Sequence, residues 1–134
     1  MDTGSSAFIL ICSAMVCLMT PALAFFYGGL GRRKNVINTM MMSVLPLAIA
    51  SLLWIVAGYS LSFGGHGNFF GNFSHLFLNG VSETASSRGL TIPDMLFAAF
   101  QMMFSIICVA ILTGSVVGRM RFTPLAIFVV FWLL

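Results

Sequence analysis

The chain has 134 residues, of which 60% are hydrophobic and only 7% are charged. Soluble domains usually carry about 25% charged residues and about 45–50% apolar ones. Six basic and three acidic side chains cannot cover a water-exposed surface, so most of the exterior must face an apolar environment. This composition excludes a soluble domain and indicates a bilayer protein. The net charge of +3 does not indicate nucleic-acid binding, because five of the six basic residues lie at the ends of apolar runs and form no stripe interleaved with aromatic residues.

The three cysteines, Cys12, Cys17 and Cys108, all lie inside apolar runs, and no Cys-x-x-Cys spacing occurs. We therefore expect apolar packing residues and neither a disulfide framework nor a zinc site. We also expect no secretory signal peptide, because the N-terminal region carries Asp2 and no positive charge.

Apolar runs divide the chain into three predicted membrane spans, at about residues 7–28, 36–63 and 93–118, and the start of a fourth at about residue 123. A transmembrane helix needs about 20 apolar residues, and the second run is longer, so it should tilt or protrude. The run that ends at Leu134 is too short to span a bilayer and too apolar for a tail in water. The predicted fold class is an all-α membrane protein with three transmembrane helices plus the start of a fourth.

Charged residues predict the orientation of these spans. The two short connections between spans hold five of the basic residues, namely Arg32, Arg33, Lys34, Arg119 and Arg121. By the positive-inside rule both connections are cytoplasmic, so the N-terminus and the loop at 64–92 are external. The three acidic residues fall on the external side, which agrees with this orientation: Asp2, Glu83 and Asp94.

Local signals mark the helix ends. Thr91 and Asp94 are spaced like a capping box with Pro93 just inside, which predicts the start of the third span. Thr123 and Pro124 repeat the cap-then-proline arrangement for the fourth. Glycine permits a helix end and close backbone approach, and three glycines close the first span: Gly28, Gly29 and Gly31.

The external loop is rich in glycine and asparagine and carries several aromatic residues, and we expect it to fold back onto the membrane surface. Its phenylalanines are Phe69, Phe70, Phe73 and Phe77. The loop also holds both histidines, His66 and His75, which are too few for a metal site. We expect solvated or capping histidines and no bound metal.

Candidate chemistry is confined to the third span. The apolar interior of the spans holds no charged residue, which disfavours a proton-coupled antiporter that works through a membrane carboxylate. Phe97, Gln101, Phe104 and Cys108 follow the spacing i, i+4, i+7, i+11 and share one helix face. An amide beside aromatic rings could line a narrow path for a small polar or cationic ligand. In a second interpretation, Gln101 hydrogen-bonds a neighbouring helix while the phenylalanines pack the bundle. Helical periodicity alone does not distinguish between these two interpretations.

Several short motifs occur in a specific order along the chain. They are residues 20–30 (TPALAFFYGGL), 33–36, Trp54 with 58–64, 70–72, 99–101 with Phe104, and 119–122. This ordered set closely resembles the first helices and connections of ammonium transporters of the Amt/Mep/Rh family. The resemblance covers nearly the whole chain and matches the predicted topology.

The resemblance implies further properties. Members of the family have about eleven spans in an inverted-repeat bundle, form homotrimers, and carry ammonium through a narrow pore in each subunit. The cation is held by aromatic contacts at an outer site and loses its proton, and ammonia crosses an apolar channel. By this resemblance Phe104 matches the outer phenylalanine gate, and Phe100 and Gln101 match neighbouring residues of the outer site. The implied ligand is ammonium or ammonia in a lipid membrane, with no cofactor and no enzymatic activity.

The chain departs from the family in two ways. Gly118 precedes Arg119 where family members often have an acidic residue, which weakens a local ion pair or cap. The family's paired pore histidines, its buried acidic residue and the tryptophan of the outer site all lie beyond the start of the fourth helix, and Trp132 precedes that tryptophan's position. We therefore expect residues 1–134 to be the N-terminal part of a single transporter domain in the cell membrane. Alone it should not transport, because one half of an inverted repeat cannot close a pore.

Two alternatives remain at this stage. A small four-helix multidrug exporter has similar size and hydropathy, but it needs a membrane-embedded carboxylate. A non-transporting assembly or sensor subunit would use the glycines of the first span for helix packing.

Overall fold

The computed structural model describes residues 2–65, 71–84, 86–116 and 118–134, and within these ranges the chain forms helices and loops without a β-strand. Helix α1 (Thr3–Leu30) has 28 residues and helix α4 (Asp94–Val116) has 23. Between them a helical stretch of 31 residues runs from Arg33 to Phe63. Each is long and apolar enough to cross a membrane. The shorter helix α5 (Phe122–Leu133) has 12 residues. The predicted all-α membrane fold is confirmed.

The stretch from Arg33 to Phe63 is built from four consecutive pieces. A short 3₁₀ turn, η1 (Arg33–Asn35), leads into α2 (Val36–Leu53), and a π-helical turn, η2 (Trp54–Gly58), joins α2 to α3 (Tyr59–Phe63). The π turn inserts an extra residue into the helical ladder, and such turns are often found at functional sites. It was not predicted from the sequence.

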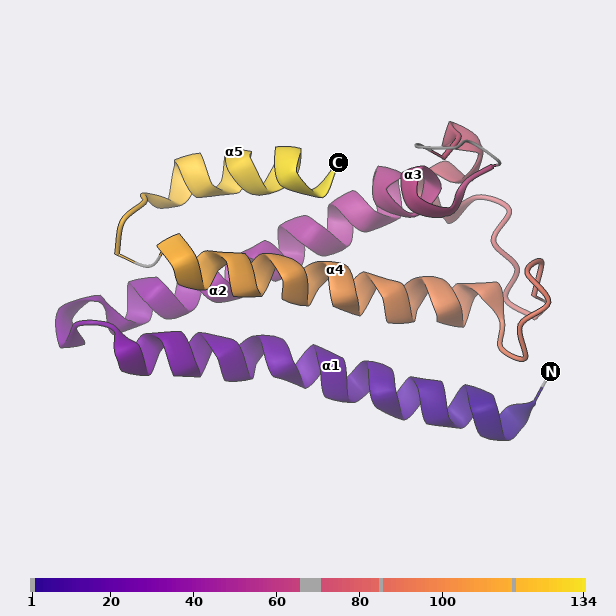
Figure 1. Ribbon diagram of the computed structural model, residues 1–134, viewed down its shortest axis with the longest axis horizontal. Coiled ribbons are helices and arrows are strands. Elements are labelled where there is room, and N and C mark those ends of the chain that lie inside the picture. The colour runs from indigo at the N-terminus through magenta and orange to yellow at the C-terminus, as the bar shows by residue number, and fades with distance from the viewer. Residues whose placement is uncertain (1, 66–70, 85, 117) are drawn as a thin grey trace.

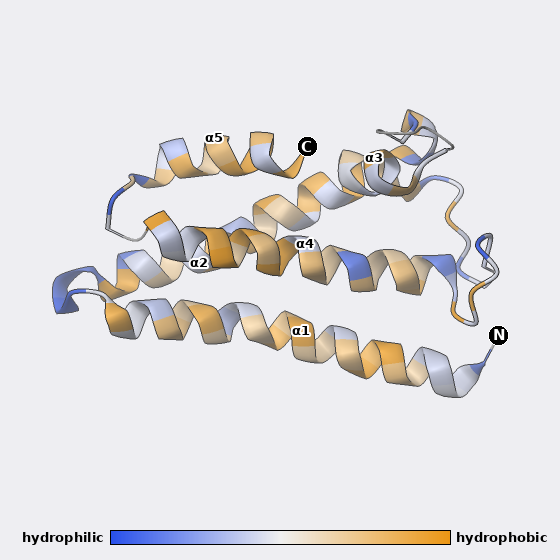
Figure 2. Ribbon diagram, in the orientation of Figure 1, coloured by the Kyte–Doolittle hydropathy of each residue, from blue (hydrophilic) through white to orange (hydrophobic). Residues whose placement is uncertain are grey.

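The helices α1, α2 and α4 pack against one another, and α5 packs on α2 (Figure 1). The N-terminus and the long loop between α3 and α4 lie at one end of the bundle, here called the acidic end. The α1–α2 and α4–α5 connections lie at the opposite end, here called the basic end (Figure 1). Figure 2 shows that hydrophilic residues gather in these connections while the helices are mostly hydrophobic.

The start of α1 is fixed by Asp2. Its carboxylate accepts hydrogen bonds from the backbone amide of Gly4 (3.1 Å) and from the hydroxyl of Ser5 (2.8 Å). The bond from Gly4 satisfies a backbone amide that has no partner inside the helix. The Ser5 hydroxyl and the amides of Gly4 and Ser5 hold the pKa of this exposed carboxyl below its usual range. Helix α1 therefore begins four residues before the apolar run, at Thr3.

Two predicted helix caps are wrong. The Asp94 carboxylate accepts hydrogen bonds from Ser87, at 2.8 Å from its amide and 2.6 Å from its hydroxyl, so it is engaged with the preceding loop rather than with Thr91. Helix α5 begins at Phe122, with Arg121 at the cap position and no capping side chain. Thr123 and Pro124 lie inside the first turn, where proline is tolerated because the amide it lacks would have no helical partner.

The first helix ends as the glycines predicted, but in an extended conformation. Gly31 follows Leu30 with φ −78° and donates its amide hydrogen to the carbonyls of Tyr27 (3.1 Å) and Gly28 (3.3 Å). A left-handed glycine instead follows α4, where Gly118 has φ +72°. A glycine suits this turn better than the acidic residue that the family resemblance leads one to expect, because left-handed backbone is strained for residues with a Cβ.

The core joins α2, α4 and α5. Its buried side chains are Met42, Ala50, Ile106, Val109, Leu125 and Val129. A polar contact crosses the same region, where the Thr113 hydroxyl donates to the Ser43 hydroxyl at 3.3 Å, both side chains being buried. Each hydroxyl also donates to a carbonyl of its own helix, Ser43 to Thr39 at 3.1 Å and Thr113 to Ala110 at 2.7 Å, so the pair marks a close approach of α4 to α2.

The α1–α4 contact depends on a small residue. The Tyr27 ring lies against Gly114, and a Cβ atom at residue 114 would overlap the ring. The Tyr27 hydroxyl lies 3.4 Å from the carbonyl oxygen of Ile111 and donates to it. By contrast, a Cβ atom at Gly29, near the end of α1, would meet no atom within 4 Å.

We predict that Gly114→Val lowers the free energy of unfolding by about 2 kcal/mol more than Gly29→Val, because only the first overpacks a helix contact. Thermal unfolding in detergent micelles, followed by circular dichroism, measures the difference. Equal midpoints for the two variants would show that the ring moves aside without cost.

Candidate functional site

The predicted site residues lie in the first half of α4. The rings of Phe100 and Phe104 meet edge to face, with centroids 5.1 Å apart and planes at 78°. This arrangement is a favoured geometry for aromatic pairs. Phe104 is 45% exposed, while Phe100 and Gln101 are half-buried. The structure thus brings Phe100 and Phe104 into contact, with Gln101 beside them in sequence.

Helix α4 has a covered face and an uncovered face. Ala98, Val109 and Ala110 are buried against the other helices. On the opposite side three side chains are exposed: Phe104, Cys108 and Ile111. Because α4 is one uninterrupted helix, Phe97, Gln101, Phe104 and Cys108 share one face as predicted. Phe104 and Cys108 are exposed on it, whereas Phe97 packs against Phe63.

Gln101 has no described hydrogen bond to a neighbouring helix, as the second interpretation from the sequence would require. Besides the Thr113–Ser43 contact, α4 receives a polar bond from Trp54 of η2, whose indole N–H donates to the Ala98 carbonyl at 3.2 Å. Trp54 is the first residue of the π turn. The side-chain amide of Gln101 is therefore available to other groups.

Phe97 belongs to a different group of rings, which we call the outer aromatic cluster: Tyr59, Phe63 and Phe97. The Phe63 and Phe97 rings are 5.2 Å apart, and the Tyr59 and Phe63 rings are 5.6 Å apart. The guanidinium carbon of Arg88 lies 4.6 Å from the Phe63 ring centre and 5.1 Å from that of Phe97. It lies 5.7 Å from the Tyr59 ring centre, and the guanidinium donates a hydrogen bond to the Phe63 carbonyl at 3.1 Å.

Arg88 was missed by sequence reasoning. The signal was present, because Arg88 is the one basic residue of the chain outside the two short connections. A guanidinium over aromatic faces is held by cation–π attraction. In the outer aromatic cluster, the rings at the acidic end thus bind a cationic group, the guanidinium of Arg88.

The long loop folds over the end of α3. The amide of Gly71 donates to the Leu61 carbonyl (2.7 Å), and the amide of Asn72 donates to the Gly64 carbonyl (2.5 Å). A Cβ atom at Gly64 or at Gly71 would overlap backbone oxygens, so this close approach needs glycine at both positions. The loop therefore covers α3, and Phe73 and Phe77 remain exposed. The expected contact with the membrane surface stays a prediction.

His75 follows the capping interpretation, since its Nδ1 lies 2.9 Å from the Asn79 carbonyl oxygen. His66, Phe69 and Phe70 lie outside the described residues. Among those that are described, no three His, Cys, Asp or Glu residues come together as a potential metal site.

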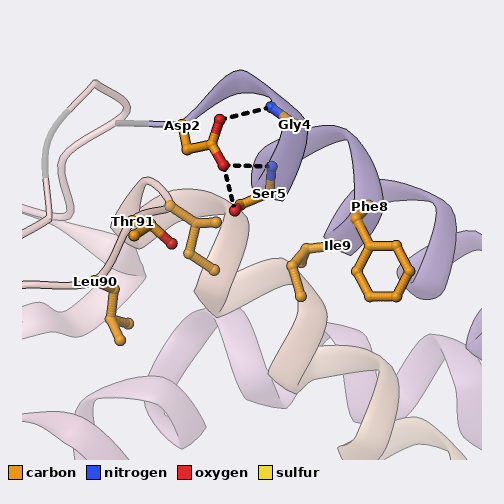
Figure 3. Close-up of a pocket in the computed structure, with 8 residues that line it drawn as sticks. Asp2, Gly4, Ser5, Phe8, Ile9, Leu90 and Thr91 are labelled. Atoms are coloured by element: carbon orange, nitrogen blue, oxygen red, sulfur yellow. Dashed lines mark hydrogen bonds between the residues drawn. The ribbon is translucent and has the colours of Figure 1, made fainter.

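A cleft of about 530 Å³ lies at the N-terminal end of α1. Asp2 and Ser5 line one side, with Phe8 and Ile9 further along the helix, and the segment at 90–92 lines the other (Figure 3). The amide of Asp2 donates to the Thr91 carbonyl at 3.1 Å, which ties the N-terminus to this segment. Phe100, Gln101 and Phe104 do not line it.

The apolar helices, their packing and the uncovered aromatic face define a multi-helix membrane protein. The model of the Ammonium Transporter Family matches residues 7–134. The chain belongs to this family.

Similar proteins support this assignment. The chain is 40% identical to an ammonium transporter of Mycobacterium tuberculosis (strain ATCC 25618 / H37Rv), over 98% of the chain and 31% of the relative. It is 39% identical to an ammonium transporter of Bacillus subtilis (strain 168), over 98% of the chain and 33% of the relative. Among solved structures, Candida albicans Mep2 is 28% identical with a TM-score of 0.86, over 98% of this chain and 29% of that one. Saccharomyces cerevisiae Mep2 is 31% identical with a TM-score of 0.84, over 98% and 31%.

The chain spans about a third of the length of the curated relatives it matches.

We predict that Arg88→Gln destabilises the acidic end by about 1–2 kcal/mol, because it removes the cation–π contacts and the hydrogen bond to Phe63. Hydrogen exchange of the amides at 71–72 should become at least fivefold faster. Lys34→Gln, which removes a solvent-exposed charge at the basic end, should leave these amides unchanged. Equal exchange in the wild type and Arg88→Gln would contradict the role given to Arg88.

Proposed function

We propose that residues 1–134 are the N-terminal part of a single transporter domain that carries ammonium or ammonia across the cell membrane. The observation that carries the proposal is the family match over residues 7–134, together with the Mep2-like fold over 98% of the chain. The relatives are about three times as long, so the complete domain has further helices, about eleven in all by the family resemblance. We also propose that the complete protein is a homotrimer.

The acidic end of the bundle faces the outside in this proposal. Five basic residues lie in the connections at the other end, and the positive-inside rule makes that end cytoplasmic. The N-terminus is then external. The outer aromatic cluster and the Phe100–Phe104 pair lie towards the side from which ammonium enters.

Phe104 acts as the outer gate, and Phe100 and Gln101 help to bind the arriving cation. The ring faces attract an ammonium ion that is losing its water, while the closely packed rings leave no room for a hydrated ion. The Gln101 amide offers a carbonyl oxygen that can accept a hydrogen bond from ammonium. The three side chains lie on or beside the uncovered face of α4, where the rest of the domain would complete the pore.

The 134-residue chain by itself is inactive in this account. Phe104 is 45% exposed here, so the segment supplies only one wall of a path. An inverted-repeat transporter forms its path at the interface of two repeats, and this chain lies within the first of them.

We predict that Phe104→Ala, in the complete transporter that contains this segment, changes cation selectivity more than stability. Removing the ring opens the gate to larger ions, so the ratio of methylammonium to ammonium uptake should rise at least severalfold. Uptake into vesicles with a panel of methylated ammonium ions measures this ratio. Phe8→Ala is the matched control, because Phe8 is 67% exposed on α1, away from the Phe100–Phe104 pair. An identical selectivity profile in the wild type and Phe104→Ala would assign Phe104 to packing alone.

A further inference from the structure

The outer aromatic cluster has the form of a cage for a cation. The guanidinium carbon of Arg88 lies between 4.6 and 5.7 Å from the centres of its three rings. Ring faces attract cations within about 6 Å of the ring centre. A guanidinium N–H also donates to the Phe63 carbonyl at 3.1 Å. Aromatic faces and a carbonyl acceptor are groups that also bind free organic cations, so the contacts of Arg88 are those of a bound cation.

The rings of this cage are held in place by contacts that do not involve Arg88. Trp54 meets the Phe63 ring edge on, with centroids 6.2 Å apart, and the Tyr59 ring at 6.4 Å. Its indole N–H is in turn held by the Ala98 carbonyl at 3.2 Å. The Tyr59 ring also meets the His75 ring, at 6.3 Å. The cage is therefore built by helices and by other rings, and we expect it to keep its shape when the guanidinium is removed.

Arg88 comes from the loop that precedes α4 and not from the helices that carry the rings. Its side chain is exposed, whereas the rings are buried or half-buried. The neighbouring Ser87 ties this part of the loop to α4, because its amide and hydroxyl both donate to the Asp94 carboxylate. A cation that a loop supplies from the solvent side can be exchanged for a free cation without rebuilding the cage.

We propose that the outer aromatic cluster is a binding site for small organic cations of the guanidinium and alkylammonium type, and that Arg88 is its tethered occupant. A tethered group competes with a free ligand at an effective concentration of about millimolar or above, so Arg88 fills the site when free cations are dilute. Phe97 lies one helical turn, about 6 Å, before Gln101 on α4, so the site adjoins the residues assigned to the arriving cation. Cation binding does not depend on transport, whereas its effect on uptake rests on the proposed function.

The test is whether a free cation replaces a missing guanidinium. In the complete transporter that contains this segment, purified in detergent micelles, Arg88→Gln empties the site. The amides of Gly71 and Asn72 report on the site, because they donate to backbone carbonyls on either side of Phe63. Methylguanidinium at about 20 mM should slow their hydrogen exchange at least threefold in Arg88→Gln and less than 1.5-fold in the wild type. N-methylurea, which has a similar shape and no charge, should have no effect in either protein.

Two outcomes of this experiment would overturn the proposal. Equal exchange rates with and without methylguanidinium in Arg88→Gln would show that the rings do not hold a free cation. An equal effect of N-methylurea would show that the probe acts as an unspecific cosolvent. Arg88→Ala should respond as Arg88→Gln does, so the result does not depend on how well one replacement folds.

Removing one ring tests whether the cage holds the cation. In the Arg88→Gln background, Phe97→Leu should weaken the binding of methylguanidinium at least about threefold, because it removes one ring face and keeps an apolar side chain. Phe73→Leu is the matched control, since Phe73 is 65% exposed and lies outside the cluster, and it should change binding less than 1.5-fold. A loss with Phe73→Leu as large as with Phe97→Leu contradicts a site built from these rings.

Competition by Arg88 also has a consequence for uptake. Arg88→Gln should lower the KM for methylammonium severalfold with little change in kcat, because a tethered positive charge no longer opposes the arriving cation. Lys34→Gln, at the basic end, should leave both constants unchanged. An unchanged or raised KM in Arg88→Gln would refute the competing role of Arg88. Absence of uptake in the wild type would instead contradict the proposed function, and the exchange experiment would still decide whether the cluster binds cations.

Discussion

The rotation of α4 about its own axis decides which of its side chains are buried against the other helices and which are left uncovered. Two contacts fix it: Gly114 leaves room for the Tyr27 ring, and the backbone carbonyl of Ala98 accepts a hydrogen bond from the Trp54 indole. The buried Thr113–Ser43 contact reinforces the same register. Once this face is covered, Phe104 and Ile111 must point away from the bundle. In a membrane protein such a face is left for lipid or for further protein.

The two ends of the bundle differ in whether their charged side chains have partners within the chain. At the acidic end the cationic Arg88 is held by aromatic faces and a carbonyl, and the Asp94 carboxylate is held by serine donors, so charges are satisfied within the chain. At the basic end no such partners of the arginines occur among the described residues. Basic residues in the short connections at one end are the charge distribution that orients membrane helices.

Much of this fold could be predicted from the sequence, since runs of about 20 apolar residues and the positions of basic residues decide the number and direction of spans. The face that holds Gln101 and Phe104 follows from helical periodicity alone. The Arg88 contacts could not be predicted, because they depend on how a glycine-rich loop folds back over α3. The π turn at Trp54 and the failure of the Thr91–Asp94 capping box have similar causes: in each case a tertiary partner decided the local geometry.

Cysteine accessibility tests the proposal that the uncovered face of α4 lines the conduction path. In the complete transporter with Cys12, Cys17 and Cys108 replaced by alanine, Ile111→Cys places a thiol two turns from Phe104 on the same face. We expect 2-aminoethyl methanethiosulfonate to block uptake in this variant, and methylammonium to slow the reaction. Met15→Cys, at an exposed position of α1, should stay insensitive. If Ile111→Cys is no more sensitive than Met15→Cys, the face does not line the path.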